Sequence, residues 1–232
     1  GQMALRFSTY RADDIDANLR RLQVRPLDVM LTGVTGAGKS STINAFFQEP
    51  IAKVGSGVDP ETMEASGYNL NKFFRIWDTP GLGDGVDIDQ IHKKKMVDLL
   101  CKTYNSNGKI YGFIDMAIIV VEGANRDMGT TYALLNEVIV PNIESDRILV
   151  VINQADVAMK SRHWDKGSSE PDSKLKAFLE EQALSIQKRV KEATGVDILK
   201  PVCYSAEYDW NVKGVFDFII DHMPKERRVL KI

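Results

Sequence analysis

Residues Gly33–Ser40 read GVTGAGKS and match the phosphate-binding pattern GxxxxGK[ST] at every fixed position. Glycines in this pattern let the backbone turn tightly and point its N–H groups at phosphate oxygens. Lys39 is then expected to reach the β- and γ-phosphates of a nucleotide, and the Ser40 hydroxyl to ligate Mg²⁺. The segment, called the phosphate loop below, predicts a nucleoside triphosphate site but leaves the base and the reaction undecided.

The phosphate loop lies between an apolar run over residues 27–31, which reads as a strand, and a segment with helical spacing that starts at Ser40. A helix that begins at the loop directs the positive end of its dipole at the phosphates. We expect the nucleotide to be held along this stretch by Gly33, Thr35, Gly36, Ala37, Gly38, Lys39, Ser40 and Ser41.

A second motif follows an apolar run that reads as a strand. Residues 78–85 read DTPGLGDG and form what we call the switch loop. The Asp78 carboxylate can hold Mg²⁺ through water, and the Gly81 N–H can meet the γ-phosphate. Because both contacts depend on the third phosphate or its metal, this loop can sense hydrolysis. Asp-x-Pro-Gly is also ordinary turn chemistry, and the upstream phosphate loop favours the functional interpretation.

A third motif, NQAD at residues 153–156, follows the apolar run RILVVI and is called the guanine loop below. The Asp156 carboxylate can accept hydrogen bonds from both the N1–H and the N2 amino group of guanine, a donor pair that adenine lacks. Asn153 is expected to tether the base and the neighbouring loops, and Gln154 to lie over the ring. Ser205 and Ala206 follow the last apolar run and are expected to offer a backbone N–H to guanine O6.

The order of these motifs resembles that of Era/TrmE-type small GTPases over roughly residues 27–223. Residues 148–156 (ILVVINQAD) and 163–165 (HWD) are most similar to the bacterial YfjP/YeeP-like branch, whereas GVTGAGKSSTINA and DTPGLGDG also resemble septin-like and AIG1-type GTPases. The resemblance implies an α/β, Ras-like P-loop NTPase fold. Its sheet would have six strands, mostly parallel with one antiparallel, and helices on both faces.

The resemblance also implies GTP or GDP as the ligand, with Mg²⁺, and a threonine that binds the metal in the GTP state. Thr62 fits by its position between the first helix and the switch loop, and Ser56 is a weaker alternative. The implied metal set is Ser40, Thr62 and Asp78, and the implied catalytic set is Lys39, Thr62 and Gly81.

Three positions depart from patterns common among GTPases. Gln154 stands where the guanine motif has lysine, and Leu82 stands where many GTPases carry the glutamine that orients the attacking water. Gly36 replaces the asparagine through which some Era/TrmE-type members bind potassium. Slow hydrolysis is therefore expected, with the water placed by backbone, another side chain or an activating protein. The alternative is a module that dimerises across its nucleotide face with little catalysis.

Apolar runs that alternate with helical segments predict an N-terminal helical extension (1–23), a GTP-binding domain (24–224) and a short, solvated basic tail (225–232). Helices are expected at 11–22, 89–104, 130–139, 173–194 and 212–222, and strands at 67–72, 73–78, 115–121, 147–152 and 202–204.

Composition narrows the function classes. The net charge of −2 argues against a dedicated nucleic-acid binder, so an RNA or ribosome contact has no support beyond the resemblance. No apolar run is long enough for a transmembrane helix, and two cysteines without CxxC spacing are expected to be reduced, mostly buried thiols in the cytoplasm. His163 and Trp164 could flank the nucleotide or cap their loop, and the sequence leaves both readings open.

Overall fold

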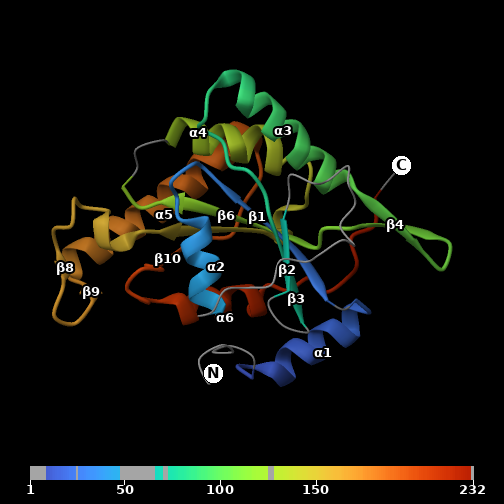
Figure 1. Cartoon of the computed structure of the whole chain (residues 1–232), viewed down its shortest axis with the longest axis horizontal. Helices are drawn as coiled ribbons and strands as arrows, with labels where there is room; N and C mark the ends of the chain where they lie inside the picture. Colours follow the sequence, from blue (N-terminus) through green and yellow to red (C-terminus); the bar gives the residue numbers. More distant parts are fainter. Residues whose placement is uncertain (1–8, 25, 48–65, 70–72, 125–127, 231–232) are drawn as a thin grey trace.

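A computed structural model describes residues 9–24, 26–47, 66–69, 73–124 and 128–230 (Figure 1). Thr62 and Ser56, the two candidates for the switch residue, lie outside these residues.

The helices are α1 (Ala12–Leu22), α2 (Lys39–Phe47), α3 (Val86–Cys101), α4 (Met128–Ala133), α5 (Ser173–Thr194) and α6 (Val212–Asp221). A π-helical segment, Leu134–Ile139, continues α4, and short 3₁₀ turns cover Ser145–Arg147 and Ala155–Val157. The strands are β1 (Leu27–Gly33), β2 (Ser66–Asn69), β3 (Phe74–Asp78), β4 (Thr103–Ser106), β5 (Lys109–Gly112), β6 (Met116–Glu122), β7 (Ile148–Asn153), β8 (Trp164–Asp165), β9 (Glu170–Pro171) and β10 (Val202–Cys203).

Six of the described strands form a central sheet, in the order β10-β7-β6-β1-β3-β2. β2 runs antiparallel to β3, and the other neighbours pair in parallel. β1, β6 and β7 are buried along their whole length, as expected for parallel strands covered on both faces. The predicted α/β fold with a mostly parallel sheet is confirmed.

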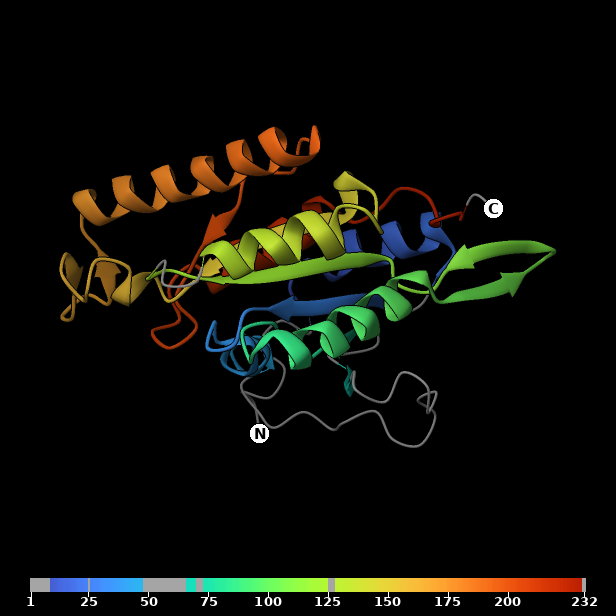
Figure 2. The ribbon, with the colours of Figure 1, turned by 90° about the horizontal axis from the view of Figure 1, so that it is seen from above.

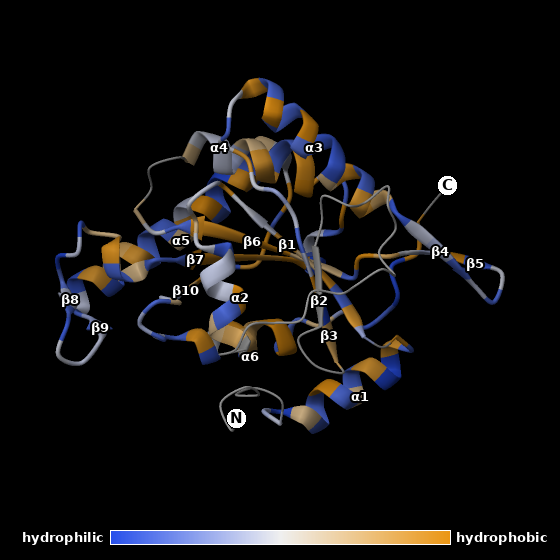
Figure 3. Cartoon of the chain, viewed as in Figure 1, coloured by the Kyte–Doolittle hydropathy of each residue, from blue (hydrophilic) through white to orange (hydrophobic). Residues whose placement is uncertain are grey.

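Helices lie on both faces of the sheet (Figure 2), and each face has its own apolar core. On one face α1, α2 and α6 pack against the strands, with Ile15 and Leu19 of α1 beside Phe216 of α6. On the other face α3, the π-helical segment and α5 pack against them. Figure 3 shows the hydrophobic colour concentrated in the strands, because their side chains are enclosed between these two helical layers.

The predicted helix over 89–104 is wrong at its C-terminal end. α3 ends at Cys101, and Thr103–Ser106 pairs with Lys109–Gly112 in a hairpin. Asn107 and Gly108 turn the chain with φ values of 51° and 78°, which is the left-handed geometry that tight hairpins require. The hairpin projects from the end of the sheet opposite β8 and β9 (Figure 1).

The basic segment near the C-terminus is not a solvated end. Arg228 is 2% exposed and donates to the carbonyls of Leu100 and Ile114. Arg227 donates to the carbonyls of Leu22 and Gln23. The segment therefore fastens α1, α3 and the start of β6 together.

Two further predictions concern the burial of the cysteines and the presence of a membrane-spanning helix. Cys101 is exposed and Cys203 is half-buried, so the expectation of mostly buried thiols fails for Cys101. None of the described helices is both long and apolar enough to cross a bilayer.

Candidate nucleotide site

The phosphate loop joins the end of β1 to the start of α2, as its pattern predicts. Gly36 and Gly38 have φ values of 88° and 87°, in the region that glycine adopts without strain. A Cβ at Gly38 would collide with the Asn153 amide, so the loop also depends on glycine for this close approach. The Ser40 and Ser41 side chains are exposed beside the loop.

Asn153, at the end of β7, connects the phosphate loop with the loop after β10. Its Nδ2 donates to the Ala37 carbonyl at 3.0 Å, and its Oδ1 accepts the Ala206 N–H at 3.0 Å. The side chain is 2% exposed. The predicted tether between neighbouring loops is therefore present, and it holds three segments that are far apart in the sequence.

Asp156 follows in the same loop and is 6% exposed. Its Oδ1 accepts a hydrogen bond from the Ser205 hydroxyl at 2.8 Å, and Ser205 Oγ in turn accepts the Tyr208 N–H. The second carboxylate oxygen has no hydrogen bond to the residues that the structure describes. This arrangement fixes the orientation of the carboxylate and leaves an acceptor for a ligand.

Gln154 adopts a left-handed backbone conformation, with φ 60°. Its Nε2 donates to the Gly36 carbonyl at 2.9 Å, so the amide lies against the phosphate loop.

Lys39 and Asp78 face each other across the phosphate side of the site. Lys39 Nζ donates to the Thr79 carbonyl at 2.7 Å. Burial lowers the pKa of Lys39, opposed by the negative charges of Asp78 and Asp84, and burial raises the pKa of Asp78, opposed by Lys39. In both groups desolvation outweighs the mutual attraction, and perturbed pairs of this kind are typical of functional sites.

The residues present fit a Mg²⁺ ion. Asp78 Oδ1 is buried and finds no hydrogen-bond partner among the described residues. A buried acceptor without a partner is costly unless a ligand satisfies it. Carboxylate, hydroxyl and water oxygens are the ligands that Mg²⁺ prefers, and the exposed Ser40 hydroxyl is a further group of this kind in the phosphate loop.

His163 and Trp164 lie behind the guanine loop. Trp164 is 8% exposed and packs against Tyr208, at 5.3 Å between ring centroids, and against Trp210. His163 Nδ1 lies 2.7 Å from Asp172 Oδ2, at the start of α5. These contacts tie both residues to the protein around their own loop, which favours the loop-capping reading over a position flanking the nucleotide. Sequence reasoning missed Tyr208 and Trp210, although both follow the Ser205-Ala206 pair.

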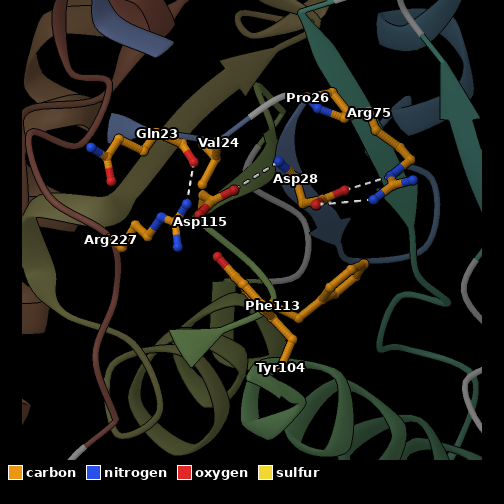
Figure 4. Close-up of a pocket in the computed structure, with 9 residues that line it drawn as sticks. All are labelled: Gln23, Val24, Pro26, Asp28, Arg75, Tyr104, Phe113, Asp115 and Arg227. Carbon is orange, nitrogen blue, oxygen red and sulfur yellow. Dashed lines mark hydrogen bonds and ion pairs between the residues drawn. The ribbon is translucent and has the colours of Figure 1, made fainter. Parts of the chain in front are cut away.

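A hollow of about 340 Å³ lies at the other end of β1 and β3, away from the phosphate loop (Figure 4). Arg75 and the Trp77 indole hold the Asp28 carboxylate, and Asp115 Oδ2 accepts the Asp28 N–H at 2.9 Å. Arg75 is thus committed to a structural pair far from the phosphate loop. Burial raises the pKa of Asp115 to about 7, opposed in part by the Asp28 N–H.

This pKa makes the stability of the protein sensitive to pH. Between the ordinary aspartate pKa and about 7, the folded chain holds a proton at Asp115 that the unfolded chain has lost. The free energy of unfolding therefore falls as pH rises through that window, by roughly 4 kcal/mol. We expect Asp115→Asn to be more stable than the unaltered protein at pH 8 and about equally stable at pH 4.5.

Urea unfolding at the two pH values measures the difference, and Asp146→Asn, at an exposed aspartate, is the matched control. An Asp115→Asn protein whose stability relative to the unaltered chain does not change with pH would contradict the assignment.

Comparisons with known proteins agree with this geometry. Residues 28–190 match the family model described as 50S ribosome-binding GTPase. Interferon-gamma-inducible GTPase 10 of Mus musculus is 37% identical over 87 residues, which span 35% of this chain and 21% of the mouse protein. The match thus covers about a fifth of that relative.

Solved structures share the fold at low sequence identity. The cytosolic domain of the T. maritima FeoB iron transporter in a GDP form matches with a TM-score of 0.52 and 18% identity, over 89% of this chain and 66% of that one. A GTP-binding protein from Sulfolobus solfataricus in complex with GDP matches at 0.51 and 16%, over 94% and 58%. Aquifex aeolicus Era bound to GDP and AlF4⁻ matches at 0.50 and 16%, over 90% and 63%. Since the family model covers well over half of the chain, the protein belongs to the 50S ribosome-binding GTPase family.

Proposed function

We propose that this chain binds GTP and GDP with Mg²⁺ and hydrolyses GTP slowly, as a molecular switch. One observation carries the proposal: Asn153 joins the phosphate loop to the segment after β10, and Asp156 presents an oriented carboxylate beside them. Phosphate groups and a purine base are thus accommodated by one connected set of loops. The family membership supports guanine as the base.

Each residue has a distinct task in the proposed site. The phosphate-loop N–H groups and Lys39 neutralise charge on the β–γ bridge and the γ-phosphate. Ser40 and Thr62 would hold Mg²⁺, with Asp78 acting through water, and the ion would supply positive charge beside the same phosphates. The Gly81 N–H meets the γ-phosphate, and Asp156 selects guanine. Ser205 orients Asp156, and Ala206, whose N–H is donated to Asn153 Oδ1 in this structure, would lie beside O6.

Slow turnover follows from the residue after Gly81. Leu82 is 1% exposed and lacks any group that could orient water. Arg75 is held by Asp28 and cannot reach the phosphates. Hydrolysis is therefore expected to be slow without a partner. The likeness to the YfjP/YeeP-like branch of Era/TrmE-type GTPases, the cytoplasmic location and the domain limits at residues 24 and 224 belong to the same proposal.

A second candidate is a module that dimerises across its nucleotide face. Three large apolar side chains stand exposed at the start of α3, directly after the switch loop: Val86 at 78%, Ile88 at 47% and Ile91 at 54%. Apolar side chains gathered at one place on a surface favour a protein contact. In this alternative, nucleotide binding controls the pairing of two copies, and hydrolysis is not its only consequence.

Turnover measured as a function of protein concentration tests both candidates. Purified protein is expected to carry or bind GDP, and to release phosphate from GTP at a low rate per molecule that is independent of concentration. A rate per molecule that rises with concentration favours dimer-stimulated hydrolysis. Binding of ADP without binding of GDP would overturn the proposal, and GDP binding without turnover at any concentration would reduce the function to the interaction module.

A further inference from the structure

The switch loop is attached to the phosphate loop through the main chain of Leu82. The Thr35 N–H donates to the Leu82 carbonyl at 2.8 Å, and the Leu82 N–H donates to the Gly33 carbonyl at 3.1 Å. The two segments thus form a short parallel bridge between Val34 and Leu82. A Cβ at Gly81 would collide with the Gly33 carbonyl, so the close approach depends on glycine there.

The start of α3 holds the same loop from the other side. The Asp89 carboxylate accepts the N–H groups of Gly83, at 3.0 Å, and Asp84, at 3.1 Å. His92 Nδ1 lies 3.0 Å from the Gly81 carbonyl. Residues 81–84 are therefore fixed at both edges, and the Asp84 side chain has a defined direction.

That direction is toward the phosphate side of the site. Asp84 Oδ1 accepts a hydrogen bond from the Thr35 hydroxyl at 3.1 Å. Thr35 is the third residue of the phosphate loop, and its side chain is exposed. The Asp84 charge also acts on the ammonium group of Lys39, which is buried in the same place. A carboxylate thus stands beside the group that is expected to meet the γ-phosphate.

We propose that Asp84, held by Thr35, orients the water that attacks the γ-phosphate of GTP. This role rests on the proposed function and supplies what the side chain of Leu82 cannot. The water oxygen forms a bond to the γ-phosphorus, while the bond from that phosphorus to the β–γ bridging oxygen breaks. The electron pair of the broken bond stays on the β-phosphate of GDP. One water proton passes to the Asp84 carboxylate and then to the released phosphate.

The carboxylate has a definite cost in this position. A fixed negative charge near the γ-phosphate repels GTP in the ground state, and this repulsion opposes GTP binding. Asp84 therefore contributes to the rate and does not strengthen nucleotide binding. A carboxylate that only competed with the γ-phosphate for Thr35 would have the opposite signature, because its removal would tighten GTP binding without slowing turnover.

The test uses Asp84→Asn, Asp84→Glu and Thr35→Val, with Asp87→Asn at an exposed position of α3 as the matched control. Asp84→Asn is expected to lower the single-turnover rate at saturating GTP by about 100-fold, the size of a lost general base. Its dissociation constant for GDP stays within about threefold of the unaltered value, since the ground-state contacts remain. Asp84→Glu keeps more of the rate than Asp84→Asn, and Asp87→Asn keeps all of it.

A binding measurement that requires no turnover accompanies the rates. GDP with AlF4⁻ imitates the γ-phosphoryl group in transfer, so its complex requires the in-line water to be held. The unaltered protein is expected to form this complex, and Asp84→Asn to lose it while still binding GDP. Thr35→Val lowers the rate less than Asp84→Asn does, and combining the two adds no further loss because both act through one carboxylate.

The outcomes separate this inference from the proposed function. An unaltered chain that neither binds GDP nor releases phosphate contradicts the proposed function and this role together. Turnover in the unaltered chain with an equal rate in Asp84→Asn contradicts this role alone. Tighter GTP binding in Asp84→Asn at an unchanged rate would mean that the carboxylate only competes with the nucleotide.

Discussion

Replacing Lys39 with alanine is expected to weaken the binding of GDP and GTP by about two to four orders of magnitude. The physical reason is that Lys39 supplies charge-assisted hydrogen bonds to two phosphates. Each such bond contributes about 1.5–3 kcal/mol, and about 1.4 kcal/mol corresponds to a tenfold change in the dissociation constant. The ammonium group is already half withdrawn from water and oriented by the Thr79 carbonyl, so little ordering opposes these contacts.

The same substitution should leave the free energy of unfolding of the nucleotide-free chain nearly unchanged. Burial lowers the pKa of Lys39, which means that the folded protein holds this charge at a cost. Removing the ammonium group relieves that cost and loses one hydrogen bond, and the two effects oppose each other. The variant is thus expected to be folded and to have lost most of its affinity for GDP and GTP.

Titration calorimetry with GDP and Mg²⁺ measures the loss, and urea unfolding checks that the variant is folded. Lys93→Ala is the matched control, because Lys93 lies on α3 and its ion pair with Glu137 is at the surface. GDP binding by Lys39→Ala at the unaltered affinity would show that the phosphate loop is not the nucleotide site.

The sheet and the site motifs were predictable from the sequence because they depend on local patterns. Continuous apolar runs indicate buried parallel strands, and GVTGAGKS predicts a turn between a strand and a helix. The order of motifs along the chain then brings them to one edge, since the carboxyl ends of parallel strands point the same way. The tether from Asn153 to the phosphate loop belongs to this predictable part.

The β4–β5 hairpin was missed although the sequence contains its signal. Asn107-Gly108 stands between two short runs that each carry tyrosine, which is a strong hairpin pattern. The predicted helix over 89–104 overlaps the start of β4. Asn107-Gly108 permits left-handed φ values and is therefore the stronger signal at this position. The helix itself ends earlier, at Cys101.

The contacts of the C-terminal segment and of Asp84 could not be read from any pattern. Arg227 and Arg228 bind main-chain carbonyls that lie from 114 to 205 residues away in the sequence. Every residue has a main-chain carbonyl, so the residue type does not indicate which carbonyls accept a hydrogen bond. Asp84 meets Thr35 only because Leu82 aligns two loops, and that alignment depends on tertiary packing.

Replacing Asp156 with asparagine is expected to exchange guanine for xanthine as the preferred base. The amide retains one acceptor for N1–H but turns a donor toward the N2 amino group of guanine. Losing one hydrogen bond to a charged acceptor, about 1.5–3 kcal/mol, and leaving two donors opposed, about 1–3 kcal/mol, together weaken GDP binding by about 3–6 kcal/mol, or about two to four orders of magnitude. Xanthine carries a carbonyl oxygen where guanine has the amino group, so the new amide N–H finds an acceptor there.

The affinities of Asp156→Asn for GDP and xanthosine diphosphate decide this prediction, and Asp98→Asn on the surface of α3 is the control. Because the asparagine oxygen can still accept the Ser205 hydroxyl, the loop should keep its geometry. Tight binding of xanthosine diphosphate would prove that the variant is folded, so the loss of GDP could be assigned to base recognition alone. Weak binding of both nucleotides would mean that Asp156 maintains the structure of the loop. Unchanged GDP binding would mean that another residue selects the base.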